Sequence, residues 1–317
     1  MTNIIAKSGG LSWPSDKVST VPYGLYTDQH QYLLEHEKVF KGPTWNYLCL
    51  DAELPENGTY KVSRIGETPI VVTRDPEGNL HAFVNRCAHR GALLCLKPEG
   101  KAEEITCVYH AWSYSLKGEL KSVAFQRGLK RQGGMPKEFD KSQHNLRRLR
   151  VVEFSGLIFG SFSEDAPDIE DYLGPEIAQR IRRVLNRPIR ILGQNVQVLN
   201  NNWKLYIENA KDSYHASILH TFFTTFEINR LNQKGGIVVD ESGGNHVSYS
   251  KIDSTLSNED YTKQNVRSSK DDYRLADPSL LDSVDEYGDG VTLQILTVFP
   301  GLVLQQIQNA IAVRQIV

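Results

Sequence analysis

Two short stretches decide the fold of the first half of the chain: Asn85-Arg-Cys-Ala-His-Arg-Gly91 and Cys107-Val-Tyr-His-Ala-Trp112. Their spacings are C-x-H and C-x-x-H, so each stretch presents one thiolate and one imidazole from a short loop. Two such loops side by side hold a [2Fe–2S] cluster when both thiolates bind one iron and both imidazoles bind the other. The pattern predicts a cluster whose four ligands are Cys87, His89, Cys107 and His110.

A structural zinc site uses the same donor types and is the competing interpretation. Zinc loops more often pair cysteine with cysteine and histidine with histidine, whereas each pair here is mixed. We therefore favour the iron–sulfur cluster, with Gly91 expected to let a backbone N–H approach a sulfide. The other two cysteines, Cys49 and Cys95, lie outside the pattern and are expected to be buried free thiols.

The residues around these stretches predict an antiparallel β domain. Runs rich in β-branched and aromatic residues, such as 70–73, 80–84 and 157–160, alternate with turns at 76–78 and 117–119. Before them, a cap at Thr27 or Asp28 predicts a helix over residues 28–40.

The rest of the chain predicts a mixed α+β domain. Pro175 opens a helix whose Ile177, Ile181 and Val184 share one face. A strand is expected over residues 189–198, a helical region over about 203–223, and further strands from 291 onward. The last strand stops at Val317 with no turn or polar tail, so we expect the sequence to be a fragment.

A second metal signal lies in the helical region, where Asp212-Ser-Tyr-His-Ala-Ser-Ile-Leu-His220 places two histidines five residues apart. On an ideal helix His215 and His220 would point roughly 140° apart, so they reach one metal only if the helix bulges or breaks. Two histidines and a carboxylate hold the non-haem Fe(II) that activates O2. Alone the pattern is weak, but it gains weight downstream of a predicted redox cluster.

Composition excludes several classes of protein. The 317 residues include 36 Lys+Arg and 38 Asp+Glu, and this net charge of −2 argues against a nucleic-acid partner. No apolar run is long enough to predict a transmembrane helix, and the N-terminus lacks the features of a secretory signal. Four cysteines are too few for a disulfide framework, so we expect a cytoplasmic protein.

Together these motifs resemble the large (alpha) subunits of Rieske non-haem iron aromatic ring-hydroxylating dioxygenases. The resemblance covers nearly the whole chain and rests on residues 21–28, 45–50, 85–93, 107–114, 202–206 and 222–227. It implies an α+β fold, with an antiparallel β Rieske domain and a helix-grip catalytic domain that is C-terminally truncated. The implied domains are an N-terminal arm and helix packing on the catalytic domain (1–43), the Rieske [2Fe–2S] domain (44–162) and the incomplete mononuclear iron domain (163–317).

The resemblance also implies roles for the second metal signal. His215 and His220 would bind the mononuclear iron, and Asp212 would link a cluster histidine of one subunit to an iron histidine of its neighbour. Family members take the third iron ligand from an aspartate far downstream. Three aspartates lie too close after His220 to match that spacing: Asp240, Asp253 and Asp277.

The implied activity is cis-dihydroxylation of an aromatic carboxylate with O2. The cofactors would be a [2Fe–2S] Rieske cluster and mononuclear non-haem Fe(II), and the partners a small (beta) subunit in an α3β3 assembly and an NAD(P)H-dependent reductase. Terephthalate is the expected substrate, with anthranilate, salicylate or a halobenzoate as alternatives. Arg314 would offer a bidentate fork to a carboxylate, or else form a surface ion pair. Three further residues, Asn209, Ile218 and Phe222, would line the pocket or else only pack the helix.

Three rival functions remain open from the sequence. A monooxygenase or demethylase of the same iron type would not retain both atoms of labelled O2 in a cis-diol. A non-catalytic Rieske electron carrier would hold two irons and turn over no substrate. A zinc-stabilised binding module would be colourless.

Overall fold

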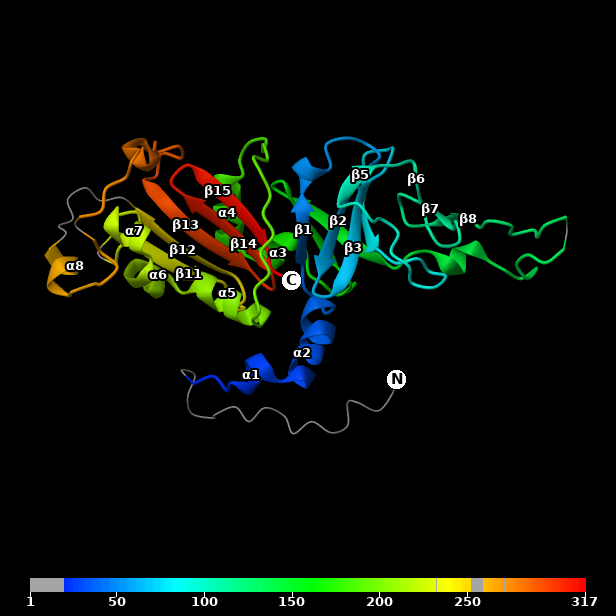
Figure 1. Cartoon of the computed structure of the whole chain (residues 1–317), viewed down its shortest axis with the longest axis horizontal. Helices are drawn as coiled ribbons and strands as arrows, with labels where there is room; N and C mark the ends of the chain where they lie inside the picture. Colours follow the sequence, from blue (N-terminus) through cyan, green and yellow to red (C-terminus); the bar gives the residue numbers. More distant parts are fainter. Residues whose placement is uncertain (1–19, 131, 232, 252–258, 271) are drawn as a thin grey trace. The chain divides into compact units, whose positions relative to one another are not determined.

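The structure is a computed structural model that describes residues 20–130, 132–231, 233–251, 259–270 and 272–317. The chain forms two compact units (Figure 1). The first comprises the described part of Met1–Ile169 with Pro188–Gln197 and Val317, and the second comprises Glu170–Arg187 and Val198–Ile316. This division differs from the expected boundaries, because residues 163–169 and 188–197 group with the first unit. The packing of residues 1–43 on the catalytic domain stays a prediction.

The first unit is built on a seven-stranded antiparallel sheet with the order β1-β10-β9-β4-β3-β2-β5. Its strands are β1 (Asn46–Leu50), β2 (Thr59–Ile65), β3 (Thr68–Arg74), β4 (Leu80–Val84), β5 (Glu99–Lys101), β9 (Arg148–Phe154) and β10 (Leu157–Ser161). Ile70, Val71 and Val72 are all fully buried, so β3 is covered on both faces.

A smaller three-stranded sheet carries the second Cys–His stretch. It consists of β6 (Glu104–Thr106), β7 (Ser113–Ser115) and β8 (Leu120–Ser122). That stretch connects β6 to β7, while the first Cys–His stretch follows β4. One buried cluster contains Phe83 of β4 and Tyr114 of β7 together with Cys87 and Cys107. The two Cys–His loops are therefore anchored in a common core.

Short helices complete the first unit: α1 (Gly24–Thr27), α2 (Gln29–Glu35), the π-turn η1 (His36–Phe40), and the 3₁₀ turns η2 (Asp51–Glu53) and η3 (Lys141–His144). The predicted helix over residues 28–40 is confirmed in α2 and η1, and the cap is Asp28, whose carboxylate accepts a hydrogen bond from Gln31 N at 2.9 Å.

The strand predicted over residues 189–198 is wrong. These residues form neither strand nor helix, and Leu192 and Val196 are 90% and 89% exposed. Gln194 Nε2 donates a hydrogen bond to Glu53 Oε1 at 2.7 Å, so the segment is held on the first unit by a side chain. The apolar alternation favours a strand only where a neighbouring strand pairs with it.

The second unit contains a five-stranded antiparallel sheet with the order β11-β12-β13-β14-β15. The strands are β11 (Gly235–Val239), β12 (His246–Lys251), β13 (Val291–Val298), β14 (Leu302–Ile307) and β15 (Ala310–Gln315). Its helices are α3 (Ile169–Leu173), α4 (Pro175–Val184), α5 (Trp203–Lys211), α6 (Ser213–Leu219), α7 (Thr221–Thr225), α8 (Glu259–Lys263) and the 3₁₀ turn η4 (Pro278–Leu281).

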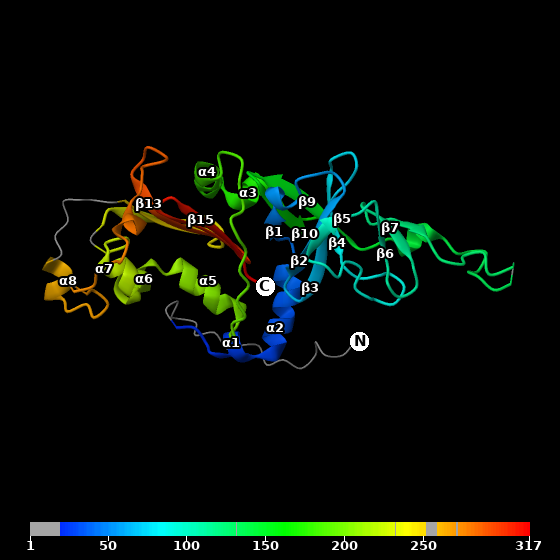
Figure 2. The same cartoon turned by 45° about the horizontal axis from the view of Figure 1, so that its top comes forward.

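Helices lie on both faces of this sheet. Figure 2 shows α4 against one face and α5, followed by α6, against the other. The predicted helix at Pro175 is confirmed as α4, in which Ile177, Ile181 and Val184 are all buried. Among the described residues, no helix has the length and apolar character needed to cross a membrane.

Arg183 ties α4 to the sheet. Its guanidinium donates to both carboxylate oxygens of Asp289, from Nε at 2.6 Å and from Nη2 at 2.8 Å, and to Val291 O at 3.1 Å. Because bidentate pairs fix geometry as well as charge, this contact sets the position of α4 against the sheet.

Replacing Asp289 with asparagine is expected to lower the free energy of unfolding by about 1–2 kcal/mol, because partial exposure moderates the loss of two charge-assisted hydrogen bonds. The hydrogen bonds from Arg183 lower the pKa of Asp289 to about 2. The contribution of this carboxylate is therefore complete above its ordinary pKa and disappears only as the pH falls toward 2. Urea unfolding should show the same difference at pH 6 and pH 8.

The control is Asp282→Asn, which changes an exposed carboxylate in the same connection before β13. An equal loss of unfolding free energy in both variants, or a loss that differs between pH 6 and pH 8, would contradict the stabilising role of the Arg183–Asp289 pair.

Candidate metal sites

The first Cys–His loop is closed by its own backbone. Cys87 N donates to Ala92 O at 2.8 Å, and Gly91 N donates to Cys87 O at 2.8 Å. Gly91 has a φ of +72°, a left-handed conformation that glycine adopts without strain. The Gly91 N–H itself closes the loop, and the expectation that Gly91 lets a backbone N–H approach a sulfide stays a prediction.

The second loop repeats the same hydrogen bonds. Cys107 N donates to Trp112 O at 2.8 Å, and Ala111 N donates to Cys107 O at 3.0 Å. Ala111 takes the position of Gly91, four residues after the cysteine, with a φ of +49°. Two unrelated sequences thus present a cysteine on the same closed loop, and the second loop does so with a residue that prefers other conformations.

The side chains of these loops separate into inner thiols and outer imidazoles. Cys87 and Cys107 are 4% and 3% exposed within the buried cluster, whereas His110 is exposed and His89 is partly buried. The rings of His89 and His110 lie 4.8 Å apart at 68°. The structure thus brings the two imidazoles together and places both thiols in the same core.

Tyr114 supports the thiol side of this arrangement. Its hydroxyl lies 3.2 Å from Cys87 Sγ and accepts a hydrogen bond from Ala88 N at 3.1 Å. Burial and the contact with Cys87 raise the pKa of Tyr114, so it stays a neutral phenol that can donate to sulfur. Sequence reasoning missed this role, although Tyr114 lies two residues after Trp112 and is buried in the same cluster.

His89 has the character of a metal ligand. In the described part of the chain its Nδ1 is buried and has no hydrogen-bond partner, which is costly unless another group occupies that position. Burial, then the neighbouring His110, lowers the pKa of His89, which favours the neutral ring that binds metals. Trp112, only 3% exposed, stacks on this ring at 4.9 Å and fixes its orientation.

The remaining cysteines behave as expected of buried free thiols. Cys49 and Cys95 are 2% and 6% exposed. Burial raises the pKa of Cys95 to about 12 and also raises the pKa of Cys49. Such thiols are poor nucleophiles and poor metal ligands at neutral pH.

The second candidate site lies where one helical region is broken twice. Asp212 separates α5 from α6, and His220 separates α6 from α7. Both residues have extended backbone, with φ and ψ of −80° and 97° at Asp212 and of −82° and 95° at His220. The predicted interruption between the two histidines is therefore present as a break, and their rings lie 5.1 Å apart at 79°.

Polar neighbours surround the first of these histidines. Asp212 Oδ2 lies 3.3 Å from His215 Nδ1, and Asn209 Nδ2 lies 3.0 Å from His215 Nε2. Asp212 also caps α6, since its Oδ1 accepts from Tyr214 N at 2.8 Å and from His215 N at 3.2 Å. Sequence reasoning missed this cap, whose signal is an aspartate directly before a helical run. Burial, then His215, lowers the pKa of His220.

No third donor joins this pair within the described residues, where no three His, Cys, Asp or Glu side chains gather for a single ion. Asp240 accepts hydrogen bonds from Ser242 Oγ and Asn245 N in its own turn, and Asp277 caps η4. Asp253 lies outside the described residues. A two-iron cluster needs only two protein donors per iron, so the absence of a threefold group fits the first site.

The expected substrate residues are spread over α5, α6, α7 and β15. Arg314 is exposed on β15, and its Nη1 donates to Tyr206 Oη of α5 at 3.3 Å. Asn209 contacts His215 directly, and Ile218 is partly buried in α6. Phe222 is 43% exposed and packs on Phe226 at 5.1 Å.

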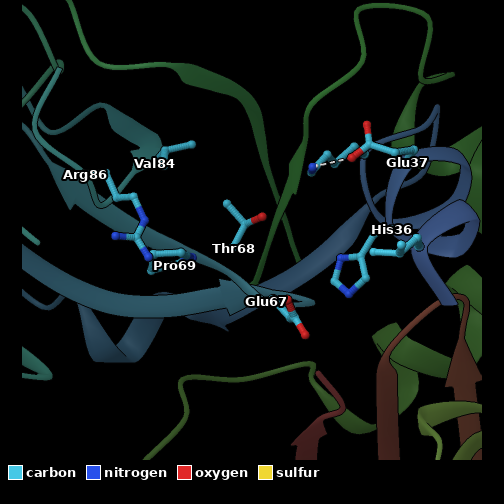
Figure 3. A pocket seen from close by; sticks show the side chains of 9 residues that line it. His36, Glu37, Glu67, Thr68, Pro69, Val84 and Arg86 are labelled. Atoms are coloured by element: carbon cyan, nitrogen blue, oxygen red, sulfur yellow. Dashed lines mark hydrogen bonds and ion pairs between the residues drawn. The ribbon is translucent and has the colours of Figure 1, made fainter. Parts of the chain in front are cut away.

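A cavity of about 340 Å³ lies in the first unit, between η1 and the sheet (Figure 3). Its lining residues are Leu33, His36, Glu37, Lys41, Glu67, Thr68, Pro69, Val84 and Arg86. Lys41 and Glu37 pair at 2.6 Å, and Arg86 Nη1 donates to Gly91 O at 3.0 Å. The cavity thus reaches Arg86, the residue before Cys87, but none of the metal-ligand and substrate residues predicted from the sequence lines it.

Known proteins are similar to this chain across the two Cys–His loops and most of the rest of its sequence. The sequence profile of the Rieske [2Fe-2S] domain matches residues 44–132. Over 306 residues the chain is 58% identical to the terephthalate 1,2-dioxygenase terminal oxygenase component subunit alpha 2 of Comamonas sp, covering 96% of this chain and 74% of that protein. The chain belongs to the Rieske non-haem iron ring-hydroxylating oxygenases.

Other members of this oxygenase family agree. The anthranilate 1,2-dioxygenase large subunit of Burkholderia cepacia is 46% identical over 310 residues, which cover 96% of this chain and 73% of that protein. The structure of naphthalene 1,2-dioxygenase from Rhodococcus sp., bound to indole, superposes with a TM-score of 0.71 at 25% identity, over 93% of this chain and 68% of that one. The predicted α+β fold, enzyme class and cofactors are thereby confirmed, and the related chains are large or alpha subunits of multi-component oxygenases.

The repeated loop predicts opposite effects of two matched substitutions. A Cβ at Gly91 would meet no atom within 4 Å, so Gly91→Ala tests the left-handed backbone alone. It should destabilise the cluster loops by about 1 kcal/mol, and Ala111→Gly should stabilise them by about 0.5–1 kcal/mol. The midpoint temperature at which the visible cluster absorbance is lost measures both effects. Shifts of the same sign in the two variants would contradict the conclusion that both loops close through a left-handed residue.

Proposed function

We propose that this chain is the large subunit of a terminal oxygenase that adds both atoms of O2 to terephthalate, giving a cis-dihydrodiol. The observation that carries this proposal is the 58% identity, over nearly the whole chain, to a subunit of terephthalate 1,2-dioxygenase. Anthranilate, salicylate or a halobenzoate is the alternative substrate, supported by lower identity to the anthranilate enzyme.

Within this proposal, the Rieske cluster is held by the two closed loops. Cys87 and Cys107, in the buried core, would hold one iron, and His89 and His110 would hold the other. The orphaned Nδ1 of His89 and the burial of both thiols support this assignment. Tyr114 adds a hydroxyl beside the Cys87 sulfur, and such hydrogen bonds tune the reduction potential.

His215 and His220 hold the mononuclear iron in the proposal, with a third carboxylate ligand that the described residues do not supply. When bound, the two iron groups supply electron storage and O2 activation. Asp212 Oδ2 lies 3.3 Å from His215 Nδ1 and Asn209 Nδ2 lies 3.0 Å from His215 Nε2, so these two neighbours would help to orient the ring that holds the metal. The Asp212 side chain is 49% exposed, so its carboxylate would also accept a hydrogen bond from a cluster histidine of a neighbouring subunit, as a bridge for the electron.

The substrate is bound through its carboxylate and its ring. Arg314 offers a planar fork to one carboxylate, and its contact with Tyr206 holds that fork beside α5. Asn209, Ile218 and Phe222 lie along the same helical region as the histidines and line the apolar part of the site. These residues orient the ring and exclude water, which is the part of the chemistry that belongs to the protein.

The proposed partners follow from the same relationship. A small beta subunit joins the chain in an α3β3 assembly, and an NAD(P)H-dependent reductase supplies the electrons. Buried cysteines without disulfides favour a cytoplasmic location.

The two metal sites should fail independently. Cys87→Ser is expected to abolish the visible absorption and the rhombic EPR signal of the dithionite-reduced cluster, because serine replaces a thiolate ligand. His215→Ala should leave both signals and the two acid-labile sulfides intact, while removing the mononuclear iron. Loss of the cluster signals in His215→Ala, or a colourless wild-type protein that contains zinc, would contradict the assignment.

Arg314→Leu is expected to raise the KM for terephthalate about tenfold, because it removes the charge-assisted partner proposed for a substrate carboxylate. Assays use the assembled oxygenase with its reductase, labelled O2, and terephthalate, anthranilate and salicylate in parallel. Arg190→Leu, at an exposed arginine of the first unit, is the control.

Retention of both labelled atoms in a terephthalate cis-diol supports the proposal. A larger kcat/KM for anthranilate, or a product with a single labelled atom, would overturn the substrate or the reaction type.

A further inference from the structure

The break at His220 creates a problem for the backbone that carries the histidines. Because α6 ends at Leu219 and α7 begins at Thr221, the last carbonyls of α6 lose their regular i+4 donors. Buried carbonyls without partners are costly, and Ser217 is only 3% exposed. A broken helix at this position therefore requires donors from elsewhere in the chain.

Two side chains from the segment 259–270 supply those donors. Tyr261 Oη, on α8, donates to Ser217 O at 2.8 Å. Ser268 Oγ donates to Ile218 O, the next carbonyl along α6. Both side chains are buried, with Tyr261 6% and Ser268 8% exposed. Their partners lie between His215 and His220.

Helix α7, which follows the break at His220, is linked to Ser268 and Tyr261 as well. Thr224 of α7 donates to His220 O from its backbone N at 2.9 Å and from Oγ1 at 3.1 Å. Thr224 Oγ1 lies 3.2 Å from Ser268 Oγ. Arg230 Nε donates to Thr224 O at 2.7 Å, and its guanidinium lies 5.0 Å from the centre of the Tyr261 ring. The two helices thus meet through one connected set of hydrogen bonds.

We propose that Tyr261 and Ser268 are positioning residues that set the angle between the two histidine rings by holding α6 and α7 in their broken arrangement. This inference rests on the proposed metal role of His215 and His220. Without the two hydroxyls, the carbonyls of Ser217 and Ile218 lose these partners, and rewinding of the helix would restore their regular i+4 donors. Rewinding would turn the two imidazoles away from each other.

The test measures metal binding on protein that carries its cluster. Co²⁺ replaces the mononuclear iron as a probe, and its affinity and visible bands are recorded for the wild type, Tyr261→Phe and Ser268→Ala. Each variant should weaken Co²⁺ binding about tenfold and shift the bands, as expected when support of a ligand is lost. Ser268→Thr keeps the hydroxyl and should restore both values.

Tyr172→Phe is the matched control, because Tyr172 Oη also donates to a backbone carbonyl of the second unit, Phe299 O at 2.7 Å. It should leave Co²⁺ affinity and bands unchanged. Wild-type Co²⁺ binding in Tyr261→Phe and Ser268→Ala, alongside loss of binding in His215→Ala, would overturn the positioning role and leave the proposed function standing. Undiminished binding in His215→Ala would instead overturn the metal role of the histidines.

Discussion

At both candidate sites the donor side chains lie where the backbone leaves regular secondary structure, and backbone polar groups released by such a departure need other partners. Both candidate sites meet this constraint. In the first unit, each Cys–His loop closes on itself through two backbone hydrogen bonds. In the second unit, a helix breaks at His220 and its carbonyls are taken up by Tyr261 and Ser268. The remaining sheets and helices of each unit support the closed loops and the broken helix.

The two candidate metal sites differ in how far along the chain their supporting residues lie. The loops around Cys87 and Cys107 need only residues within five positions of each cysteine, together with the core formed by Tyr114 and Trp112. The histidine pair depends on a segment about 40 residues further along the chain. A site of the second kind couples metal geometry to the placement of a distant connection, so substitutions in that connection affect a metal they do not touch.

The distance along the chain between a site and its supporting residues explains which features the sequence predicts and which it does not. The spacings around Cys87 and Cys107 predict the first site because its geometry is set by neighbours in the chain. The helical arithmetic at His215 and His220 predicts an interruption, and the structure contains one. Tyr261 and Ser268 have no such signal, because long-range hydrogen bonds leave no periodic pattern. The strand predicted over residues 189–198 failed for a related reason, since the alternation of apolar residues does not specify a pairing partner.

The central claim is that this oxygenase subunit carries two kinds of iron site on these named residues. The most direct measurement is anomalous diffraction at the iron edge from crystals of the assembled enzyme prepared without oxygen. The account predicts two neighbouring iron peaks between the loops of Cys87 and Cys107 and a separate peak between His215 and His220. A single peak with a zinc edge at the loops, or no peak beside the histidine pair, would contradict it.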